Sequence, residues 1–308
     1  MPKDWCPFCP GSGKVPDQYT VLVYPNDFPA LSVTPPKPDV ESTGLYQAEE
    51  SYGVCEVILF SPDHFASLHS LPLAHLCQLV VLWKERFEHY TKDERIQYIF
   101  EFENRGEEVG VTMPHPHGQL YGYPFVPLKL RTELDACRDY YALHGRDMIG
   151  DMNAEELRFG HRIVFETEHF LCYLPFFTDY PYGAFITAKA MLGSFADFGE
   201  AEMADLALAI KQLTGTFDAL FDRPFPYMMC VHQRPVNCPE YADSGAYFRF
   251  HIEFYPPLRD SSRIKYYASS ESGGWAAANT RAVEETALEM RNTLAKFVAT
   301  DPELKSTI

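Results

Sequence analysis

The sequence predicts an α+β protein in which a unit of strands and one long helix occurs twice. Short β-branched or aromatic runs are typical of strands, and they fall into two series: residues 19–24, 54–60 and 96–102, then 170–174, 183–187, 227–232 and 249–254. Apolar residues at helical spacing predict one long helix in each series, between residues 60 and 96 and between residues 187 and 227. Each series ends in a histidine-bearing strand that is followed by proline. This repeated order predicts a tandem duplication with halves at residues 1–150 and 151–308, built from antiparallel sheets with flanking helices.

The helices are predicted from the spacing of their apolar side chains. Residues three or four apart share one face of a helix, so a stripe at that spacing marks the face that packs on a core. Such stripes occur in both long helices, at Leu76, Leu79, Val80, Trp83 and Phe87, and at Met203, Leu206, Ile210, Leu213, Phe217 and Leu220. Further helices are predicted over residues 128–144 and 282–298. Each long helix is therefore expected to pack on a sheet through one face.

The composition excludes several classes of protein. The 308 residues carry a formal net charge of −17 at pH 7, which disfavours a general nucleic-acid binder because such proteins present a basic surface to phosphates. A hydrophobic fraction of 46% and an aromatic fraction of 15% exclude a disordered acidic chain. Apolar runs fall short of the roughly 18 residues that a membrane span needs, and the first residues lack the basic and apolar regions of a secretory signal. We therefore expect a folded, cytoplasmic protein without a nucleic-acid or membrane partner.

Cysteine spacing points to a metal near the start of the chain. Of eight cysteines, only Cys6 and Cys9 lie close together, and a reducing compartment disfavours a disulfide framework. A CxxC pair binds a metal or exchanges electrons. A redox pair opens a helix after a strand, whereas Pro10, Gly11 and Gly13 follow here. Metal binding is therefore the favoured interpretation, with redox chemistry as the alternative.

The most informative segment is His115-Pro116-His117-Gly118-Gln119. Side chains two residues apart in a strand point to the same face, so both histidines and the glutamine are expected to project together unless Pro116 interrupts the strand. Neutral imidazole acts as a nucleophile or as a metal ligand, and Gly118 lets a phosphate or a backbone segment approach closely. Two structural histidines at a strand edge are the alternative, but proline, glycine and glutamine are unusual neighbours for core histidines.

With Glu103-Asn104-Arg105-Gly106 before it, this segment resembles the active-site signature of the galactose-1-phosphate uridylyltransferase family, a branch of the histidine-triad superfamily. Further motifs extend the resemblance over nearly the whole chain: Cys6-Pro7-Phe8-Cys9, Asn26-Asp27-Phe28-Pro29-Ala30-Leu31, Phe60-Ser61-Pro62-Asp63-His64, Phe225-Pro226-Tyr227 and Phe254-Tyr255-Pro256-Pro257. The resemblance implies two histidine-triad-like halves. The N-terminal half would hold a zinc site and the catalytic histidine, and the C-terminal half a sugar-binding segment.

The resemblance also implies an enzyme that transfers UMP from a UDP-hexose such as UDP-glucose to a sugar 1-phosphate, either galactose 1-phosphate or a related sugar. The family residue that matches His117 attacks the α-phosphorus and forms a uridylyl-histidine intermediate, from which a second sugar 1-phosphate takes the UMP. Such double displacement gives ping-pong kinetics. Gln119 would bind the non-bridging oxygens of the nucleotidyl group, and Thr112 would face the sugar-linked phosphate.

Two metal sites are implied in the same way. Zinc would be held by Cys6, Cys9, His64 and His115, a Cys₂His₂ set suited to a closed structural site. A second metal, iron or another zinc, would be held by a mixed set of carboxylates and imidazoles: Glu133, His232, His251 and Glu253. The family has a histidine at the last of these positions. A hydrogen-bonded polar cluster without a metal is the alternative for the second set.

Contacts to the nucleotide and the sugar follow from the resemblance as well. Phe8 would lie near the base, Asn26 and Asp27 would hold the uracil and the ribose, and Asn104 would face the phosphates. From the residues alone, Asn26 and Asp27 are a turn pair. The hexose-binding stretch of the family resembles residues 265–271, from which three side chains would contact the sugar: Lys265, Tyr266 and Glu271.

Two departures from the family concern the sugar end of the substrate. Ser269 replaces a usual glycine, Trp275 adds bulk, and a glutamine found in many members is absent. The sequence also begins five residues before Cys6, without the extension that supplies phosphate-binding arginines across the homodimer of dimeric members. We therefore expect nucleotidyl transfer with a divergent sugar site. The resemblance to dimeric members also implies a homodimer.

Two other functions would use the same motif. A histidine-triad phosphorylase or hydrolase that acts on ADP-sugars or dinucleoside polyphosphates would employ the same covalent histidine with a different acceptor. A non-catalytic nucleotide-sugar sensor would keep the fold, but a sensor is expected to lose the nucleophile first. The intact motif around His117 therefore favours an enzyme.

Overall fold

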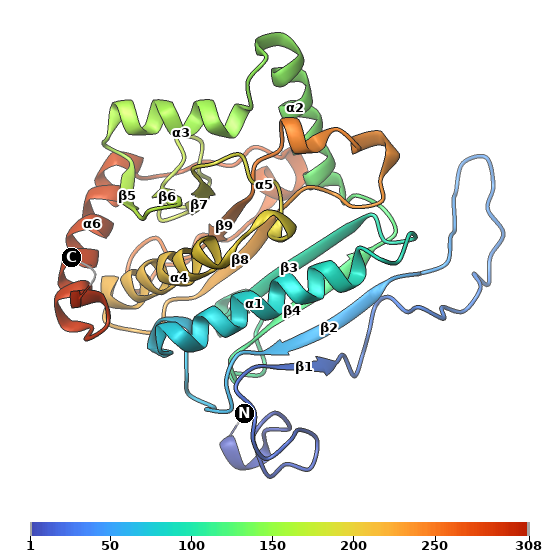
Figure 1. Cartoon of the computed structure of the whole chain (residues 1–308), viewed down its shortest axis with the longest axis horizontal. Helices are drawn as coiled ribbons and strands as arrows, with labels where there is room; N and C mark the ends of the chain where they lie inside the picture. The colour runs from blue at the N-terminus through green and yellow to red at the C-terminus, as the bar shows by residue number, and fades with distance from the viewer. Residues whose placement is uncertain (1, 307–308) are drawn as a thin grey trace.

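The computed structural model describes residues 2–306 and consists of one nine-stranded sheet with helices packed against it (Figure 1). The strands are β1 (Leu22–Pro25), β2 (Val54–Leu59), β3 (Tyr98–Arg105), β4 (His117–Tyr123), β5 (Ile163–Glu166), β6 (Phe170–Tyr173), β7 (Ala184–Ala188), β8 (Tyr227–His232) and β9 (His251–Tyr255). The α-helices are α1 (Leu73–Tyr90), α2 (Leu128–His144), α3 (Met148–Phe159), α4 (Glu200–Leu220), α5 (Ser269–Gly274) and α6 (Val283–Thr300). The strand order is β1-β2-β4-β3-β8-β9-β7-β6-β5, with antiparallel neighbours throughout.

The two halves of the chain repeat one order of elements and meet at the centre of the sheet. In the first half β2, α1, β3 and β4 follow one another, as β7, α4, β8 and β9 do in the second. β3 pairs with β8, so that Phe102 lies opposite Cys230 and Arg105 opposite Tyr227. The predicted α+β class with a repeated unit is confirmed, and the two units form one continuous sheet. The predicted boundary at residues 150 and 151 falls within α3, and this division stays a prediction.

One face of the sheet carries the main core. The helices α1 and α4 lie side by side on this face (Figure 1), and α6 packs against α4 and the edge strand β5. The apolar stripes predicted for α1 and α4 point into this core, where all but Leu220 are buried. Strands of both halves contribute to it, among them β2, β3 and β4 through Ile58, Ile99 and Leu120. Burial of both stripes explains why the helical periodicity was readable in the sequence.

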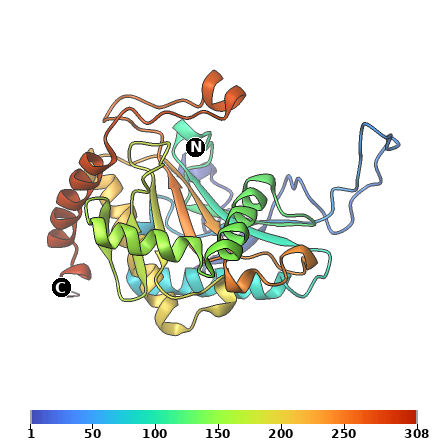
Figure 2. The same cartoon turned by 90° about the horizontal axis from the view of Figure 1, so that it is seen from above.

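The opposite face is covered in part. Along β3, Ile99 belongs to the core under α1 and α4, whereas Tyr98 packs with α2. Because side chains alternate along a strand, α2 lies on the second face. Figure 2 shows the segment that holds α5 projecting on this side as well, away from α1 and α4. His117 and Gln119 alternate with Leu120 along β4. They therefore lie on the second face, beyond the part that α2 covers.

Element boundaries differ from the sequence prediction at the N-terminal edge. β1 begins at Leu22 rather than at residue 19, because its pairing with β2 starts with Leu22 opposite Leu59. β4 begins at His117, so His115 precedes the strand. Between β1 and β2 a long loop reaches away from the sheet (Figure 1). The helix α3 and the strand β5 were not predicted, since neither shows a regular stripe or a long apolar run.

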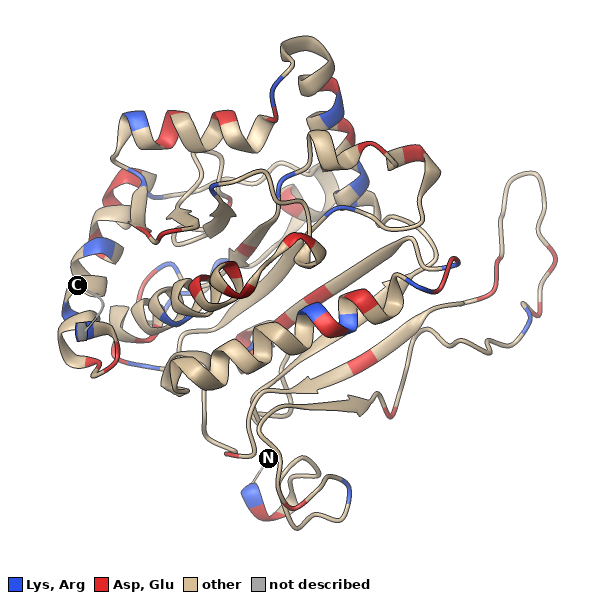
Figure 3. Ribbon diagram, viewed as in Figure 1, with Lys and Arg blue, Asp and Glu red and all other residues tan. Residues whose placement is uncertain are grey.

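Surface charge is mixed along the chain. Figure 3 shows Lys and Arg scattered among Asp and Glu over the helices, instead of collecting on one element. Recognition of an anion would therefore have to rest on local contacts and not on the charge of a whole face. Within residues 2–306, no helix combines the length and the apolar character that crossing a membrane requires.

Candidate active site and metal centres

Four predicted zinc ligands come together from three separate segments. Cys6 and Cys9 precede β1, His64 follows β2, and His115 precedes β4. Their ligand atoms all lie within 4.8 Å of one another, and all four residues are buried. The Cys9 Sγ atom lies 3.4 Å from His64 Nδ1 and 3.6 Å from His115 Nδ1. The group thus has the residue types and the closeness of a tetrahedral metal site.

The hydrogen bonds of His115 favour metal ligation. Its Nε2 atom lies 2.8 Å from the Ser61 carbonyl oxygen, to which it donates, and this leaves the Nδ1 lone pair facing Cys9. Burial lowers the pKa of His115 to about 4 and keeps the ring neutral. Burial and the neighbouring Cys6 raise the pKa of the Cys9 thiol to about 11. A cation between these atoms would stabilise the thiolates that burial disfavours, so the four residues fit a zinc ion.

His117 is held in one tautomer beside this group. Its Nδ1 atom donates to the His115 carbonyl oxygen at 2.7 Å, which leaves the Nε2 lone pair free. Burial lowers the pKa of His117 below its usual value, so the ring is neutral near pH 7. His115 lies outside the strand, yet both imidazoles lie near the Phe8 ring, with centroid distances of 6.0 Å for His115 and 5.9 Å for His117. A neutral imidazole with one free nitrogen has the properties of a nucleophile.

Two cavities meet at His117. The larger, of about 390 Å³, lies toward His64 and His115, and the smaller, of about 180 Å³, lies toward Gln119. Asn104, Thr112 and His117 line both. The structure therefore places two predicted contact residues, Asn104 and Thr112, around the proposed nucleophile.

Gly118 explains how β4 fits between its neighbours. A Cβ atom on it would lie 2.7 Å from the Phe60 ring and 2.9 Å from the Phe102 carbonyl oxygen, so a side chain has no room there. Close packing at Gly118 therefore holds β4 in place between His117 and Gln119, which face the cavity. From the sequence, Gly118 was expected to let a phosphate or a backbone segment approach closely. In the structure, the Phe102 backbone and the Phe60 ring approach it.

The residues predicted to bind the nucleoside lie at the edge of the smaller cavity. Asn26 Nδ2 donates to Gln119 Oε1 at 3.4 Å, while Asn26 Oδ1 accepts from the Phe28 amide at 2.9 Å. The second bond is the turn contact expected from the residues alone. The Phe8 ring lies 5.9 Å from the ring of His117. The turn and the apolar ring are thus both next to the face of β4 that carries His117.

Asp27 has partners of its own. It accepts from Lys14 Nζ at 3.1 Å and from the Tyr24 hydroxyl at 3.1 Å, and these bonds lower its pKa. The carboxylate is therefore ionised and well oriented as an acceptor. Ribose hydroxyls would have to share it with Lys14 and Tyr24.

The second predicted metal set also comes together, where α2 crosses β8 and β9. Glu133 Oε2 lies 2.7 Å from His232 Nδ1, and Glu133 Oε1 lies 2.9 Å from His251 Nε2. Glu253 approaches both rings, at 3.4 Å from His232 Nε2 and 3.5 Å from His251 Nε2. All ligand atoms lie within 4.8 Å of one another. The helix predicted over residues 128–144 is thus what brings Glu133 to the two strands.

The two carboxylates of this group need a positive charge beside them. His251 Nδ1 donates to the Arg249 carbonyl at 2.9 Å, so Nε2 is the atom that faces the carboxylates, yet it makes no aligned hydrogen bond. Burial by itself would lower the pKa of His251, but Glu133 and Glu253 outweigh burial and raise it to about 10. Either an added proton or a metal ion therefore satisfies Nε2, and the four residues fit a divalent cation.

The predicted hexose-binding segment lies elsewhere. Lys265 is buried and donates to the carbonyl oxygens of Asp179 and Ala278, the latter at 2.8 Å. Tyr266 is exposed, and Glu271 lines a third cavity, of about 720 Å³, together with Trp275 and the two carboxylates of the second metal set. Within one chain, none of these three residues lines the cavities at His117.

Both halves of the chain match one family. Residues 2–127 match the galactose-1-phosphate uridyl transferase N-terminal domain, and residues 133–287 match the C-terminal domain of the same enzyme. A galactose-1-phosphate uridylyltransferase of Thermotoga maritima is 38% identical over 94% of this chain and 90% of that protein. The chain belongs to the galactose-1-phosphate uridylyltransferase family. The enzyme of the same name from Haemophilus influenzae is 32% identical over 85% of this chain and 75% of that protein.

Solved structures agree with this membership. A structure described as a uridylyltransferase superposes with a TM-score of 0.89 at 30% identity, covering 96% of this chain and 93% of that one. An ADP-glucose phosphorylase from Arabidopsis thaliana with bound ADP-glucose superposes with a TM-score of 0.78 at 24% identity, covering 94% and 91%. At 24% identity, the likeness to the phosphorylase shows only that the two proteins share a fold. The uridylyltransferase family predicted from the sequence motifs is confirmed.

Two residues at these sites were not predicted from the sequence. The Tyr19 hydroxyl lies 3.2 Å from His115 Nε2 and donates to the Phe8 carbonyl at 2.8 Å, which ties the cysteine-bearing segment to His115. Lys129 Nζ donates to Glu253 Oε2 at 2.8 Å. Lys129 precedes Glu133 by one helical turn in a predicted helix, so spacing could have found it. Nothing in the sequence near Tyr19 marks its role.

Proposed function

We propose that this chain transfers UMP between UDP-glucose and galactose 1-phosphate, or a related sugar 1-phosphate, through a covalent intermediate on His117. The observation that carries the proposal is the fixed tautomer of His117, whose Nδ1 is bound by the His115 carbonyl while Nε2 stays free at the junction of two cavities. Membership of the family supports the reaction.

The chemistry consists of two displacements at phosphorus. Nε2 of His117 attacks the α-phosphorus of UDP-glucose, the bond from that phosphorus to the bridging oxygen breaks, and glucose 1-phosphate leaves with the electron pair. A phosphate oxygen of the second sugar 1-phosphate then attacks the uridylyl-histidine, the P–N bond breaks, and neutral imidazole is regenerated. Both steps displace a good leaving group from the same phosphorus, so one site serves both. Burial of His117 keeps the attacking nitrogen unprotonated.

Three polar residues support the displacement in this proposal. Gln119 would donate its amide to a non-bridging oxygen of the α-phosphate, where charge shifts during the reaction. Asn104 and Thr112 line both cavities at His117 and would orient the phosphate of the leaving or entering sugar. Phe8, Asn26 and Asp27 would hold the uridine at the edge next to Gln119.

Zinc at Cys6, Cys9, His64 and His115 would have a structural part. An ion bound there supplies four bonds that tie three chain segments together. His115 would thereby be fixed, and its carbonyl oxygen orients His117. The residues at the reacting phosphorus act without a metal of their own.

For the second set we propose iron or a second zinc ion, with the metal-free polar cluster as the competing result. Purified protein is then expected to contain about two metal ions per chain. In a Glu253→Gln variant the second set loses one anionic ligand, and metal analysis should find about one ion, the zinc. Wild-type protein that holds one ion per chain after growth with both metals would favour the polar cluster.

The sugar and the assembly complete the proposal. Lys265, Tyr266 and Glu271 would contact the hexose, and since none of them reaches the cavities at His117 in its own chain, a homodimer would have to bring them to the partner's His117. We place the enzyme in the cytoplasm. Eight cysteines without a disulfide support this location.

The test is to trap the intermediate. The protein is incubated briefly with UDP-glucose or with ADP-glucose, quenched, and analysed for a nucleotide linked to histidine by mass spectrometry. A uridylyl group on His117 and release of glucose 1-phosphate are expected. If adenylate alone is retained, the chain is an ADP-sugar phosphorylase or hydrolase, and if no nucleotide is retained, the covalent mechanism is wrong. Trapped enzyme offered a panel of sugar 1-phosphates would then identify the acceptor.

A further inference from the structure

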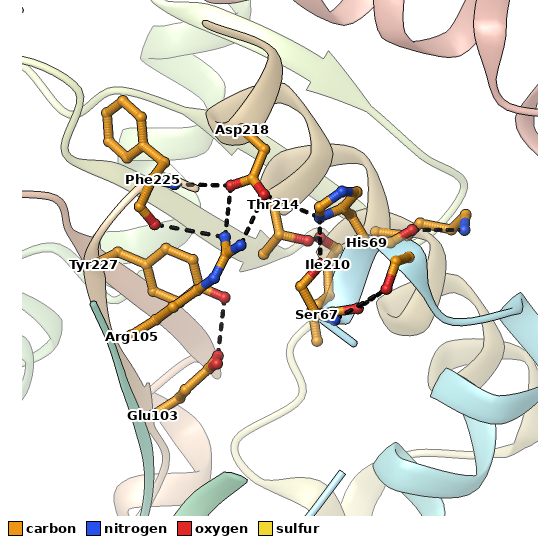
Figure 4. A network of polar contacts seen from close by, with 11 residues as sticks. Ser67, His69, Glu103, Arg105, Ile210, Thr214, Asp218, Phe225 and Tyr227 are labelled. Atoms are coloured by element: carbon orange, nitrogen blue, oxygen red, sulfur yellow. Dashed lines mark hydrogen bonds and ion pairs between the residues drawn. The ribbon is translucent and has the colours of Figure 1, made fainter. Parts of the chain in front are cut away.

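An ion pair joins the two halves of the chain beside the larger cavity. Arg105, at the end of β3, makes a two-pronged contact with Asp218 near the end of α4: NH1 lies 2.6 Å from Oδ1 and NH2 lies 2.7 Å from Oδ2 (Figure 4). Each side chain is only 17% exposed. Two parallel hydrogen bonds hold a guanidinium and a carboxylate in one relative orientation.

Further contacts hold both members of the pair. The Arg105 guanidinium lies over the ring of Tyr227, and the Tyr227 hydroxyl donates to Glu103 at 2.9 Å (Figure 4). The Phe225 amide donates to Asp218 Oδ1 at 3.0 Å, and His69 Nδ1 lies 3.6 Å from Asp218 Oδ2. Phe225 and Tyr227 belong to the segment that enters β8. The pair is therefore bound from α4, from β8 and from the segment before α1.

The place of Arg105 in the chain connects this pair to the proposed phosphate contacts. Asn104 precedes it, and Gly106 follows at the start of the loop that leads through Thr112 to His115. Gly106 has a φ of +99°, and a Cβ atom on it would lie 2.7 Å from Pro226 Cβ, so the loop turns in tight contact with the second half. Arg105, Asp218, Asn104 and Thr112 all line the 390 Å³ cavity.

The ion pair between Arg105 and Asp218 positions the backbone more than it stabilises the fold. Taking two charges out of water costs free energy that their attraction repays only in part, so a partly buried pair contributes little net stability over apolar residues of the same size. What the pair does provide is a defined position for the backbone at Arg105. Errors of about 1 Å in the placement of groups around a reacting atom can cost on the order of 100-fold in rate.

We propose that Arg105 and Asp218 are positioning residues that hold Asn104 and the loop of residues 106–113 against the sugar-phosphate part of the substrate. This inference rests on the proposed function. Both side chains are engaged with each other, so they act through the backbone and not by touching the substrate. The uridine end, at Phe8, Asn26 and Gln119, lies on another part of the site and does not depend on them.

The test is an Arg105→Gln variant examined in separate half-reactions. The KM for galactose 1-phosphate in the second half-reaction is expected to rise about tenfold or more, because Asn104 and the loop lose their fixed position. The Kd for UMP, measured by calorimetry, is expected to stay within about twofold of wild type. An Asp218→Asn variant keeps an acceptor for the Phe225 amide and should show the same split. The double variant should be no worse than the worse single one, because both changes break one interaction.

A matched control variant distinguishes the loss of a positioning contact from a general loss of thermal stability. Arg162 is likewise partly buried, and it pairs with Glu156 at 2.9 Å next to the edge strand β5. Arg162→Gln should lower thermal stability to a comparable extent without changing either constant by more than about twofold. If Arg105→Gln raises the Kd for UMP and the KM for galactose 1-phosphate equally, or changes neither, the positioning role is wrong. Absence of a uridylyl intermediate in wild-type protein would instead overturn the proposed function.

Discussion

Replacing His117 by glycine is expected to abolish UMP transfer while the protein still binds UDP-glucose. The change removes the protein atom that would form a bond to phosphorus, whereas the residues next to the uridine stay in place. Loss of a covalent nucleophile lowers kcat by on the order of 10⁴-fold or more. The rate of exchange between UDP-glucose and radiolabelled glucose 1-phosphate measures the first half-reaction directly. Binding of UDP-glucose by calorimetry should change by less than about tenfold.

His89 offers a control for the loss of a histidine. It lies exposed near the end of α1, and His89→Ala should leave exchange unchanged. Structural disturbance in the His117 variant would appear as a loss of metal, since the neighbouring His115 belongs to the proposed zinc set. Exchange at a wild-type rate in a His117→Gly protein that keeps its metal would remove His117 from the mechanism.

Local patterns in the sequence predicted most of the elements that build the site. The stripe at Trp83 and Phe87 and the run over residues 128–144 follow helical periodicity, and the structure has α1 and α2 there. The spacing of His115, His117 and Gln119 predicted a strand that Pro116 could interrupt. In the structure β4 starts at His117, directly after Pro116, and His115 lies outside the strand.

Contacts between distant segments lay outside what periodicity can predict. Arg105 and Asp218 are 113 residues apart and meet because β3 pairs with β8, a register that neither strand shows on its own. The two metal sets were named from family motifs. The first converges where the segments before β1, after β2 and before β4 meet, and the second where α2 crosses β8 and β9. Tyr19 contributes one hydroxyl at the right place, and only the folded chain reveals it.

Replacing Cys6 by serine is expected to remove one zinc ion per chain and to lower thermal stability. A serine hydroxyl does not ionise near neutral pH and is a poor substitute for a thiolate on zinc. Structural zinc sites in small domains contribute apparent binding energies of about 10–16 kcal/mol. Even a small part of that energy would lower the Tm of a protein of this size by about 5 °C or more. Metal analysis and calorimetric unfolding measure the two effects.

The same variant tests how the zinc group bears on catalysis. The His115 carbonyl holds the tautomer of His117, so loosening the segment that carries both residues should also reduce UMP exchange, although less than removal of His117 itself. Cys77 provides the control, because it lies on α1 outside both metal sets. Cys77→Ser should keep its zinc and its exchange rate. An unchanged zinc content in Cys6→Ser would show that the ion, if bound, is held by other residues, and the four-ligand assignment would then be wrong.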